Sequence, residues 1–268
     1  MNEVSIRLQG GLGNYMFQIA CAHAYGLKHN KKTVLSTDDS MIVHKHITNY
    51  KENILKNVEL IPSWNHTNFK MYNEIDFSYN EIPNIGGSVY LNGYFQSEKY
   101  FIEYKEEIKN LFSFPVNIFD DVFETVFDKY KINLSEDNTC SIHVRRGDYL
   151  KLPDHHPTQN MNYYMKAIKQ MSKDTKFLIF SDDISWCKEN FPDIPEKFIF
   201  IEGGQDFEDL LMMSLCKNNI TCNSTFSWWA AWLNNNPDKI VIAPSVWFGS
   251  AYSDYDISDL YCDGWIKI

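Results

Sequence analysis

The amino-acid sequence predicts an α/β fold with two Rossmann-like domains that face a cleft. From residue 140 onward, apolar strand-like segments alternate with segments of helix length, which is typical of a parallel sheet with helices on both faces. The chain also opens with a strand-like segment, a glycine-rich turn and a helix-length segment. Its 268 residues suit one large domain or two small ones. We expect an amino-terminal domain over 1–135 and a carboxy-terminal domain over 136–268.

The composition excludes several classes of protein. Hydrophobic residues make up 44% and charged residues 22%, which supports a packed core and excludes wholesale disorder. No apolar run approaches the roughly 20 residues of a membrane-spanning helix, and the first residues lack the pattern of a secretory signal. The net charge of −10 argues against a nucleic-acid partner, and the six cysteines form no C-x-x-C pair. We expect a cytoplasmic protein without an integral membrane segment; peripheral association with a membrane stays open.

In the first half, an apolar segment at 4–8 predicts a strand, and Gly10-Gly11-Leu12-Gly13 interrupts it. Asn14 is placed to cap a following helix at 16–29. Residues 37–86 show no clear period, and we expect loops and short helices there. The other elements predicted in this half are strands at 33–35 and 88–95 and helices at 98–111 and 119–130.

In the second half, the hydrophobic pattern is more regular. Strands are predicted at 140–144, 177–180, 198–201, 220–222 and 240–243, with helices between them at 162–171, 184–190, 207–217 and 226–234. Ligands of such sheets bind beyond the carboxyl ends of the strands. We therefore expect the chemistry of this protein in the segments that follow the strands.

The glycine-rich turn is the first of four such segments. Gly11 and Gly13 would let backbone N–H groups approach a ligand closely, and a helix N-terminus favours an anion. The alternative is a tight turn that merely needs positive φ angles. Because Met16 stands where G-x-G-x-x-G requires its third glycine, the pattern weakens a dinucleotide-dependent oxidoreductase.

The second segment, His143-Val144-Arg145-Arg146-Gly147-Asp148, concentrates the scarce arginines. The chain has 22 lysines but only three arginines, and the third is Arg7. The planar guanidinium binds phosphate oxygens bidentately, which lysine cannot do. Side chains that alternate along the backbone would point Arg145 and Arg146 to opposite sides, so that one meets a ligand and the other braces the structure. The alternative is a structural ion-pair network.

The third and fourth segments also follow predicted strands. Asp182 and Asp183 could hold a divalent metal, accept hydrogen bonds from a nucleobase, or cap the next helix. Ser224, Thr225 and Ser227 would place hydroxyl groups at a helix N-terminus, which forms an anion site or a simple cap. Three tryptophans, Trp228, Trp229 and Trp232, fit the core.

Taken together, these segments resemble the α-1,2-fucosyltransferases that use GDP-fucose, glycosyltransferase family 11. The matching stretches are GGLGNYMFQIA, HVRRGDYL, SDD and DLLMMSLCKNNITCNSTFSWWAAWL, in that order, and they extend over most of the chain. Two positions depart from the family: Tyr15, where glutamine is usual, and Ile19, where tyrosine is usual. The resemblance implies the GT-B fold and no bound metal or other cofactor. Animal members carry an amino-terminal membrane anchor, so this chain resembles the soluble bacterial type.

The resemblance also implies roles for individual residues. His143 and one of Asp182 or Asp183 would contact the guanine, and Arg145 the diphosphate, with Arg146 contacting or supporting it. Thr225 and Ser227, beside Ser224, would bind phosphate or sugar. Asn14, with Gly11 and Gly13, would reach the cleft from an acceptor-side domain at 1–135, while 136–268 would bind the GDP-sugar.

The implied reaction is an inverting transfer of fucose to the 2-hydroxyl of a terminal β-galactoside in an oligosaccharide or polysaccharide. Arg145 is the candidate that stabilises the leaving diphosphate. Asp148 is the candidate base, because inverting glycosyl transfer commonly assigns that task to a carboxylate; it could instead orient Arg146. Two alternatives stay open: another GDP-sugar or linkage on the same fold, and a module that binds nucleotide-sugar or glycan without turnover.

Overall fold

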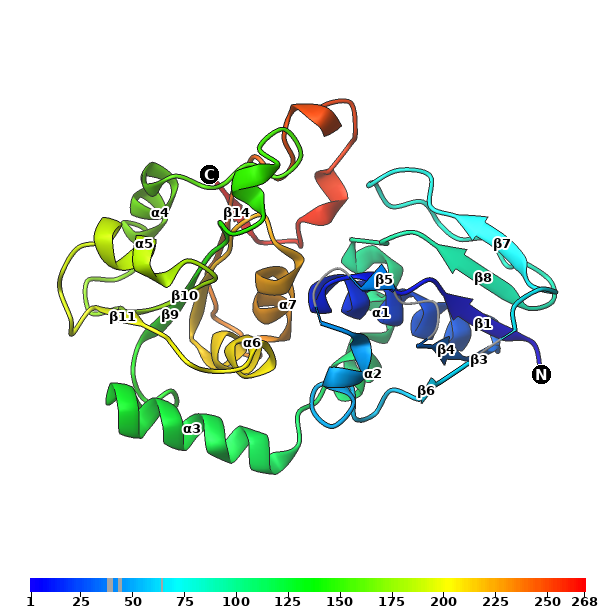
Figure 1. Cartoon of the computed structure of the whole chain (residues 1–268), viewed down its shortest axis with the longest axis horizontal. Coiled ribbons are helices and arrows are strands. Elements are labelled where there is room, and N and C mark those ends of the chain that lie inside the picture. Colours follow the sequence, from blue (N-terminus) through cyan, green and yellow to red (C-terminus); the bar gives the residue numbers. More distant parts are fainter. Residues whose placement is uncertain (38–40, 43–44, 64) are drawn as a thin grey trace. The chain divides into compact units, whose positions relative to one another are not determined.

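The computed structural model describes residues 1–37, 41–42, 45–63 and 65–268, and the chain divides into two compact units (Figure 1). The first unit is Met1–Pro115 with Tyr255–Cys262, and the second is Val116–Asp254 with Asp263–Ile268. The division therefore falls at residue 115 and not at 135. Helix α3 (Val116–Tyr130) belongs to the second unit, where the Tyr130 hydroxyl donates to the Glu202 carbonyl oxygen at 3.2 Å.

A parallel sheet of four strands, in the order β3-β1-β8-β7, organises the first unit. Its strands are β1 (Glu3–Ile6), β3 (Lys32–Thr33), β7 (Lys70–Asn73) and β8 (Val89–Asn92). Shorter two-stranded pairs join β2 (Gln9–Gly10) to β5 (Met41–Ile42) and β4 (Leu35–Ser36) to β6 (Leu60–Ile61). The expected loop region thus contains strand β7. Its side chains are mostly exposed, so the strand shows no hydrophobic pattern in the sequence.

Helix α1 (Leu12–His29) packs against this sheet and is buried over most of its length. It begins four residues before the predicted start, because the Asn14 and Tyr15 N–H groups both donate to the Gly11 carbonyl oxygen. Gly11 is therefore the N-cap residue, and Asn14 lies inside the first turn. The expectation that Asn14 caps this helix is wrong.

The segment predicted as one helix at 98–111 is divided into three pieces. Two short 3₁₀ helices, η2 (Glu98–Tyr100) and η3 (Ile102–Tyr104), precede α2 (Lys105–Leu111). Phe101, between the two 3₁₀ helices, has φ −143°, ψ 1°, which is not helical. Its side chain is buried, so packing overrides the helical propensity at this point.

The second unit contains a parallel sheet of six strands in the order β11-β10-β9-β12-β13-β14. The strands are β9 (Thr139–Val144), β10 (Lys176–Ser181), β11 (Phe198–Phe200), β12 (Asn218–Ile220), β13 (Val241–Ala243) and β14 (Ile266–Lys267). The helices are α3, α4 (Met161–Ile168), α5 (Ile184–Asn190), α6 (Asp206–Leu215) and α7 (Thr225–Leu233). The predicted alternation is confirmed, and β14 extends it by one strand.

The two faces of strand β9 pack against different helices. Cys140, Ile142 and Val144 belong to a buried cluster that includes Tyr164 of α4 and Cys187 of α5. The intervening His143 faces the other way, and its ring lies 5.5 Å from that of Phe226 in α7. Because successive side chains of a strand alternate, one strand contributes both a core face and a functional side chain. Among the described residues, no helix combines the length and hydropathy needed to cross a bilayer.

Candidate functional site in the second unit

Three neighbouring strands end at the same edge of the second sheet. Register pairs Val144 of β9 with Ser181 of β10, and Ile142 of β9 with Ile220 of β12. Since all three strands are parallel, the segments that follow them lie together. The structure thereby gathers the arginine segment, the paired aspartates and the segment around Ser224 at one edge.

Arg145 lies between two carboxylates. Its Nη2 is 2.8 Å from Oδ1 of Asp148, and its Nη1 is 3.0 Å from Oδ2 of Asp182. The arginine side chain is 25% exposed and that of Asp148 is 44% exposed, so solvent reaches the pair. The carboxylates raise the pKa of Arg145, against the lowering effect of its burial, so the guanidinium stays charged.

Arg146 has different partners. Its Nε donates to Oδ2 of Asp183 at 3.0 Å, and its guanidinium carbon lies 4.0 Å from the ring centroid of Trp186. The side chain is only 16% exposed. Asp183 also caps α5, because its Oδ1 accepts from the Trp186 N–H at 3.2 Å. The hydrogen bonds from Arg146 and Trp186 lower the pKa of Asp183.

The paired aspartates therefore have separate tasks. Asp182 accepts from the backbone N–H of Arg146 at 2.9 Å through Oδ1, while its Oδ2 faces Arg145. Asp148 contacts Arg145, which contradicts the alternative that it orients Arg146; Asp183 does so instead. Within the described ranges, no three histidine, cysteine or acidic side chains form a metal-binding group.

His143 lies in strand β9, two residues before Arg145. It is 6% exposed, and its Nδ1 is 3.2 Å from the sulfur of Cys222, a fully buried residue that follows β12. Burial, with a smaller contribution from the nearby Arg145 charge, lowers the pKa of His143 to about 3. The imidazole is therefore neutral at physiological pH.

The segment between β12 and α7 is held by its own hydrogen bonds. Ser224 caps α7, since its Oγ accepts from the Phe226 N–H at 3.3 Å. Ser227 is buried, and its hydroxyl donates to the Ser224 carbonyl oxygen at 3.3 Å. Thr225, the first residue of α7, is partly exposed. The three tryptophans that follow are buried, as predicted: Trp228, Trp229 and Trp232.

The residues predicted in the glycine-rich turn lie in the first unit. Gly10 has φ +92°, and a Cβ there would lie 2.3 Å from Nδ2 of Asn14, so only glycine fits. Gly11 has extended φ and ψ, while Gly13 is buried in the first turn of α1. Asn14 accepts a hydrogen bond from Nε2 of Gln96 at 3.0 Å. The positive φ expected of this turn thus occurs at Gly10.

The two departures from the family pattern, Tyr15 and Ile19, are both fully buried in α1. Burial raises the pKa of Tyr15, and its hydroxyl has no hydrogen-bond partner among the described residues. Their side chains therefore belong to the packing of the first unit.

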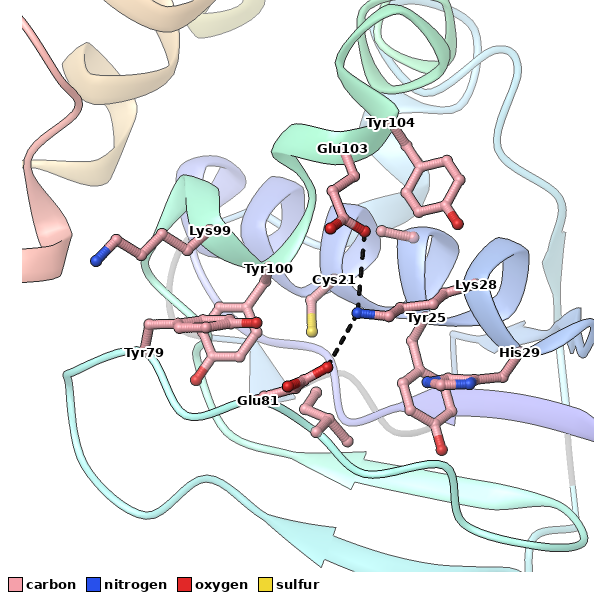
Figure 2. Close-up of a pocket in the computed structure, with 12 residues that line it drawn as sticks. Cys21, Tyr25, Lys28, His29, Tyr79, Glu81, Lys99, Tyr100, Glu103 and Tyr104 are labelled. Carbon is pink, nitrogen blue, oxygen red and sulfur yellow. Dashed lines mark hydrogen bonds and ion pairs between the residues drawn. The ribbon is translucent and has the colours of Figure 1, made fainter.

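A separate pocket of the first unit lies beside the second half of α1 (Figure 2). Tyrosines contribute most of its rings, and the Lys28 amino group points between two carboxylates. It lies 3.1 Å from Glu81 and 3.9 Å from Glu103. Lys28 thus already has two carboxylate partners, and we place no ligand in this pocket.

Three contributors to the second unit's site were not identified from the sequence. Trp186 stacks on Arg146, Cys222 contacts His143, and Tyr149 donates to the Asn223 carbonyl oxygen at 2.9 Å. Trp186 and Tyr149 lie within five residues of the predicted aspartates and arginines, but nothing in the local pattern separates them from core aromatics. Cys222 could be found only from the pairing of β12 with β9.

Two α/β units with parallel sheets, the second with arginines at its strand ends, form a fold of the GT-B type. Solved fucosyltransferases share this fold. The NodZ α-1,6-fucosyltransferase co-crystallised with GDP has a TM-score of 0.54 at 13% identity, covering 85% of this chain and 91% of that chain. POFUT1 in complex with GDP-fucose has a TM-score of 0.55 at 11% identity, covering 88% and 95%.

The sequence profile of Glycosyl transferase family 11 matches residues 1–268, and the chain belongs to this family. The α-1,2-colitosyltransferase of Escherichia coli is 31% identical over 92% of this chain and 93% of its own length. The O-antigen biosynthesis glycosyltransferase WbnK of Escherichia coli is 29% identical over 97% of this chain and 99% of its own length. The predicted family and fold are thus confirmed.

Proposed function

We propose that this protein transfers fucose from GDP-fucose to the 2-hydroxyl of a terminal β-galactoside, with inversion and without a metal ion. The observation that carries this proposal is the position of Arg145, a charged guanidinium at the carboxyl ends of parallel strands, partly open to solvent. A diphosphate presents the paired oxygens that such a fork binds. The solved NodZ structure was co-crystallised with GDP and the solved POFUT1 structure is a complex with GDP-fucose, which supports this donor class.

In the proposed reaction, the galactoside hydroxyl attacks the anomeric carbon of fucose as the bond to the β-phosphate oxygen breaks. Negative charge grows on the departing GDP, and a fixed cation beside it lowers the barrier. The diphosphate would replace at least one carboxylate as the partner of Arg145. Arg146 keeps its contacts with the Trp186 ring and the Asp183 carboxylate, and these contacts hold the arginine segment in place.

The same contacts support a reaction without a metal ion. Asp182 and Asp183, the acidic pair that a divalent cation would need, are each engaged by an arginine in this structure. In this proposal the positive charge that neutralises the diphosphate comes from Arg145.

Asp148 is our candidate for the base. Its carboxylate is the more exposed of the two partners of Arg145, so an acceptor hydroxyl can approach it. When the diphosphate replaces Asp148 as the ion-pair partner of Arg145, the Asp148 carboxylate becomes available to accept the hydroxyl proton. A transition state with strong oxocarbenium character requires only a weak base.

The test is GDP release from GDP-fucose in the presence of a β-galactoside, with and without EDTA, followed by NMR of the product linkage. We expect an α-1,2-linked product and a rate that EDTA leaves unchanged. Loss of activity in EDTA and its recovery with Mg²⁺ or Mn²⁺ would contradict the metal-free reaction. Tight GDP binding without turnover on a broad acceptor panel would instead indicate a binding module.

The similarity to an α-1,2-colitosyltransferase favours a second donor, GDP-colitose, whose sugar is fucose without its 3-hydroxyl. The ratio of kcat/KM for the two donors separates them. A site that hydrogen-bonds the 3-hydroxyl rejects the deoxy sugar by a factor of about 10⁴, whereas a site that fits the deoxy sugar discriminates against fucose by only about 10². A preference for GDP-colitose would replace fucose in the proposed reaction.

A further inference from the structure

We propose that Cys222 is a positioning residue of the donor site: its thiol donates a hydrogen bond to Nδ1 of His143 and thereby keeps the ring proton on Nε2. The hydrogen bond itself is independent of the donor's identity. Its consequence for catalysis rests on the function proposed above.

The contact joins two segments that lie far apart in the chain. Cys222 follows strand β12, His143 lies in β9, and these strands pair in parallel. The sulfur is 3.2 Å from Nδ1, which is within hydrogen-bond distance for a thiol. Cys222 is fully buried and His143 nearly so, which leaves water little access to either group.

The surroundings determine the charge of both groups. A buried imidazole next to the Arg145 cation stays neutral, in agreement with its pKa of about 3. Burial also raises the pKa of the Cys222 thiol to about 12, so the sulfur keeps its proton. A neutral thiol thus faces a neutral ring that carries one N–H and one bare nitrogen.

The geometry around the sulfur decides which group donates. Ser227 Oγ is the alternative acceptor for the thiol proton, but it lies 3.9 Å away, and its own proton goes to the Ser224 carbonyl oxygen. Nδ1 is therefore the nearer acceptor. A thiol that donates to Nδ1 requires the ring proton on Nε2.

This tautomer gives His143 a defined chemical role. Nε2–H is a donor, so it recognises a carbonyl or phosphoryl oxygen of the nucleotide and cannot accept from a ring N–H. Cys222 acts on the ligand through His143 and does not touch it.

The first test is an NMR spectrum of ¹⁵N-histidine-labelled protein without ligand, with the His143 signals assigned from a His143→Gln variant. We expect a bare Nδ1 and a protonated Nε2 in the wild type and in Cys222→Ser, whose hydroxyl also donates. Cys222→Ala removes the donor, and we expect the Nδ1–H form to appear. A protonated Nδ1 in the wild type would overturn the proposal, and this measurement needs no Cys222 variant to fold.

The second test is kinetic and uses Cys216→Ala as the control, since Cys216 is a buried thiol of the same unit that donates to the Met212 carbonyl oxygen. In Cys222→Ala we expect the donor KM to rise about tenfold, as the loss of one hydrogen bond implies. Cys222→Ser should recover most of this loss, and Cys216→Ala should not change KM. A tautomer shift in Cys222→Ala without any change in KM would show that the hydrogen bond exists but does not contribute to donor binding. If Cys222→Ala keeps the wild-type tautomer and KM, Cys222 is not a positioning residue.

Discussion

Arg145 and Arg146 are neighbours in the sequence, but their side chains differ in exposure and in the partners that they contact. Arg146 is covered by the Trp186 ring and bound by Asp183, and both partners come from the segment after β10. Arg145 is more exposed, and its guanidinium carbon lies 5.7 Å from the centroid of the Tyr149 ring. Its ion-pair partners are two carboxylates, which a more strongly anionic ligand can replace. At the residue scale, Arg146 is braced by its protein partners, and Arg145 is the more solvent-exposed arginine of the two.

Arg145→Lys separates charge from geometry. Lysine keeps the positive charge but loses the planar fork, so we expect kcat to fall on the order of a hundredfold, the usual effect of losing a fixed donor to a developing anion. We expect the midpoint of urea unfolding to stay near the wild-type value. Arg146→Lys is the matched variant: it loses the stacking on Trp186, and we expect a loss of about 1 kcal/mol of stability. Equal kcat in the wild type and Arg145→Lys would show that the site does not use the bidentate fork.

The sequence predicted that the arginines, aspartates and hydroxyl residues follow strands, and they follow β9, β10 and β12. Their contacts with a ligand stay predictions. It did not predict which carboxylate pairs with which arginine. Asp148 lies close to both arginines in the chain, yet Arg146 pairs with Asp183, which arrives from another strand. Such partners depend on strand order, which no local pattern of residues specifies.

At the scale of elements, the site consists of strand ends that approach one another closely. A Cβ at Gly147 would lie 2.6 Å from Oδ2 of Asp182, the oxygen that faces Arg145. The residue is exposed, so this close approach, and not the core, requires glycine there.

Gly147→Ala should therefore push the Asp182 carboxylate away from Arg145 without unfolding the sheet. We expect the Kd for GDP, measured by calorimetry, to change by about tenfold or more, since a hydrogen bond to a charged group contributes about 1.5–3 kcal/mol. Gly86→Ala is the control, because a Cβ at that position meets no atom within 4 Å. Identical GDP affinity and thermal stability in all three proteins would contradict this role of Gly147.

Elements were predictable where burial imposes a period. Strand β9 is buried along its whole length, and its predicted bounds differ from the observed ones by one residue. Strand β7 was missed because its side chains are mostly exposed, and the helix at 98–111 was predicted as continuous because its break depends on the packing of Phe101. The errors thus lie where tertiary contacts, and not the local period, determine the backbone.

At the scale of the whole molecule, the chain passes between the two units three times, at 115–116, 254–255 and 262–263. The last two passages place Tyr255–Cys262 in the first unit, although the sequence assigns it to the second. Its anchors are distant side chains: Tyr255 packs edge-on against Phe77 at 5.1 Å, and Asp259 binds Lys99 and the Tyr79 N–H. The periodicity of apolar residues cannot indicate that such a segment belongs to the first unit.

Asp259 should determine how firmly this segment binds the first unit. Its Oδ2 accepts from the Tyr79 N–H at 2.9 Å, and its Oδ1 pairs with the Lys99 amino group. The Asp259 side chain is only 19% exposed, so Asp259→Ala leaves a poorly solvated N–H without its acceptor, at a cost of about 1–3 kcal/mol. Asp259→Asn keeps an acceptor for Tyr79 and loses only the pairing with exposed Lys99, for which we expect a loss of about 0–1 kcal/mol of stability.

Hydrogen exchange followed by mass spectrometry should show faster exchange in the peptides around 79 and 255–262 in Asp259→Ala, but little change in Asp259→Asn. Equal acceleration in both variants would mean that the charge on Lys99, and not the hydrogen bond to Tyr79, holds the segment.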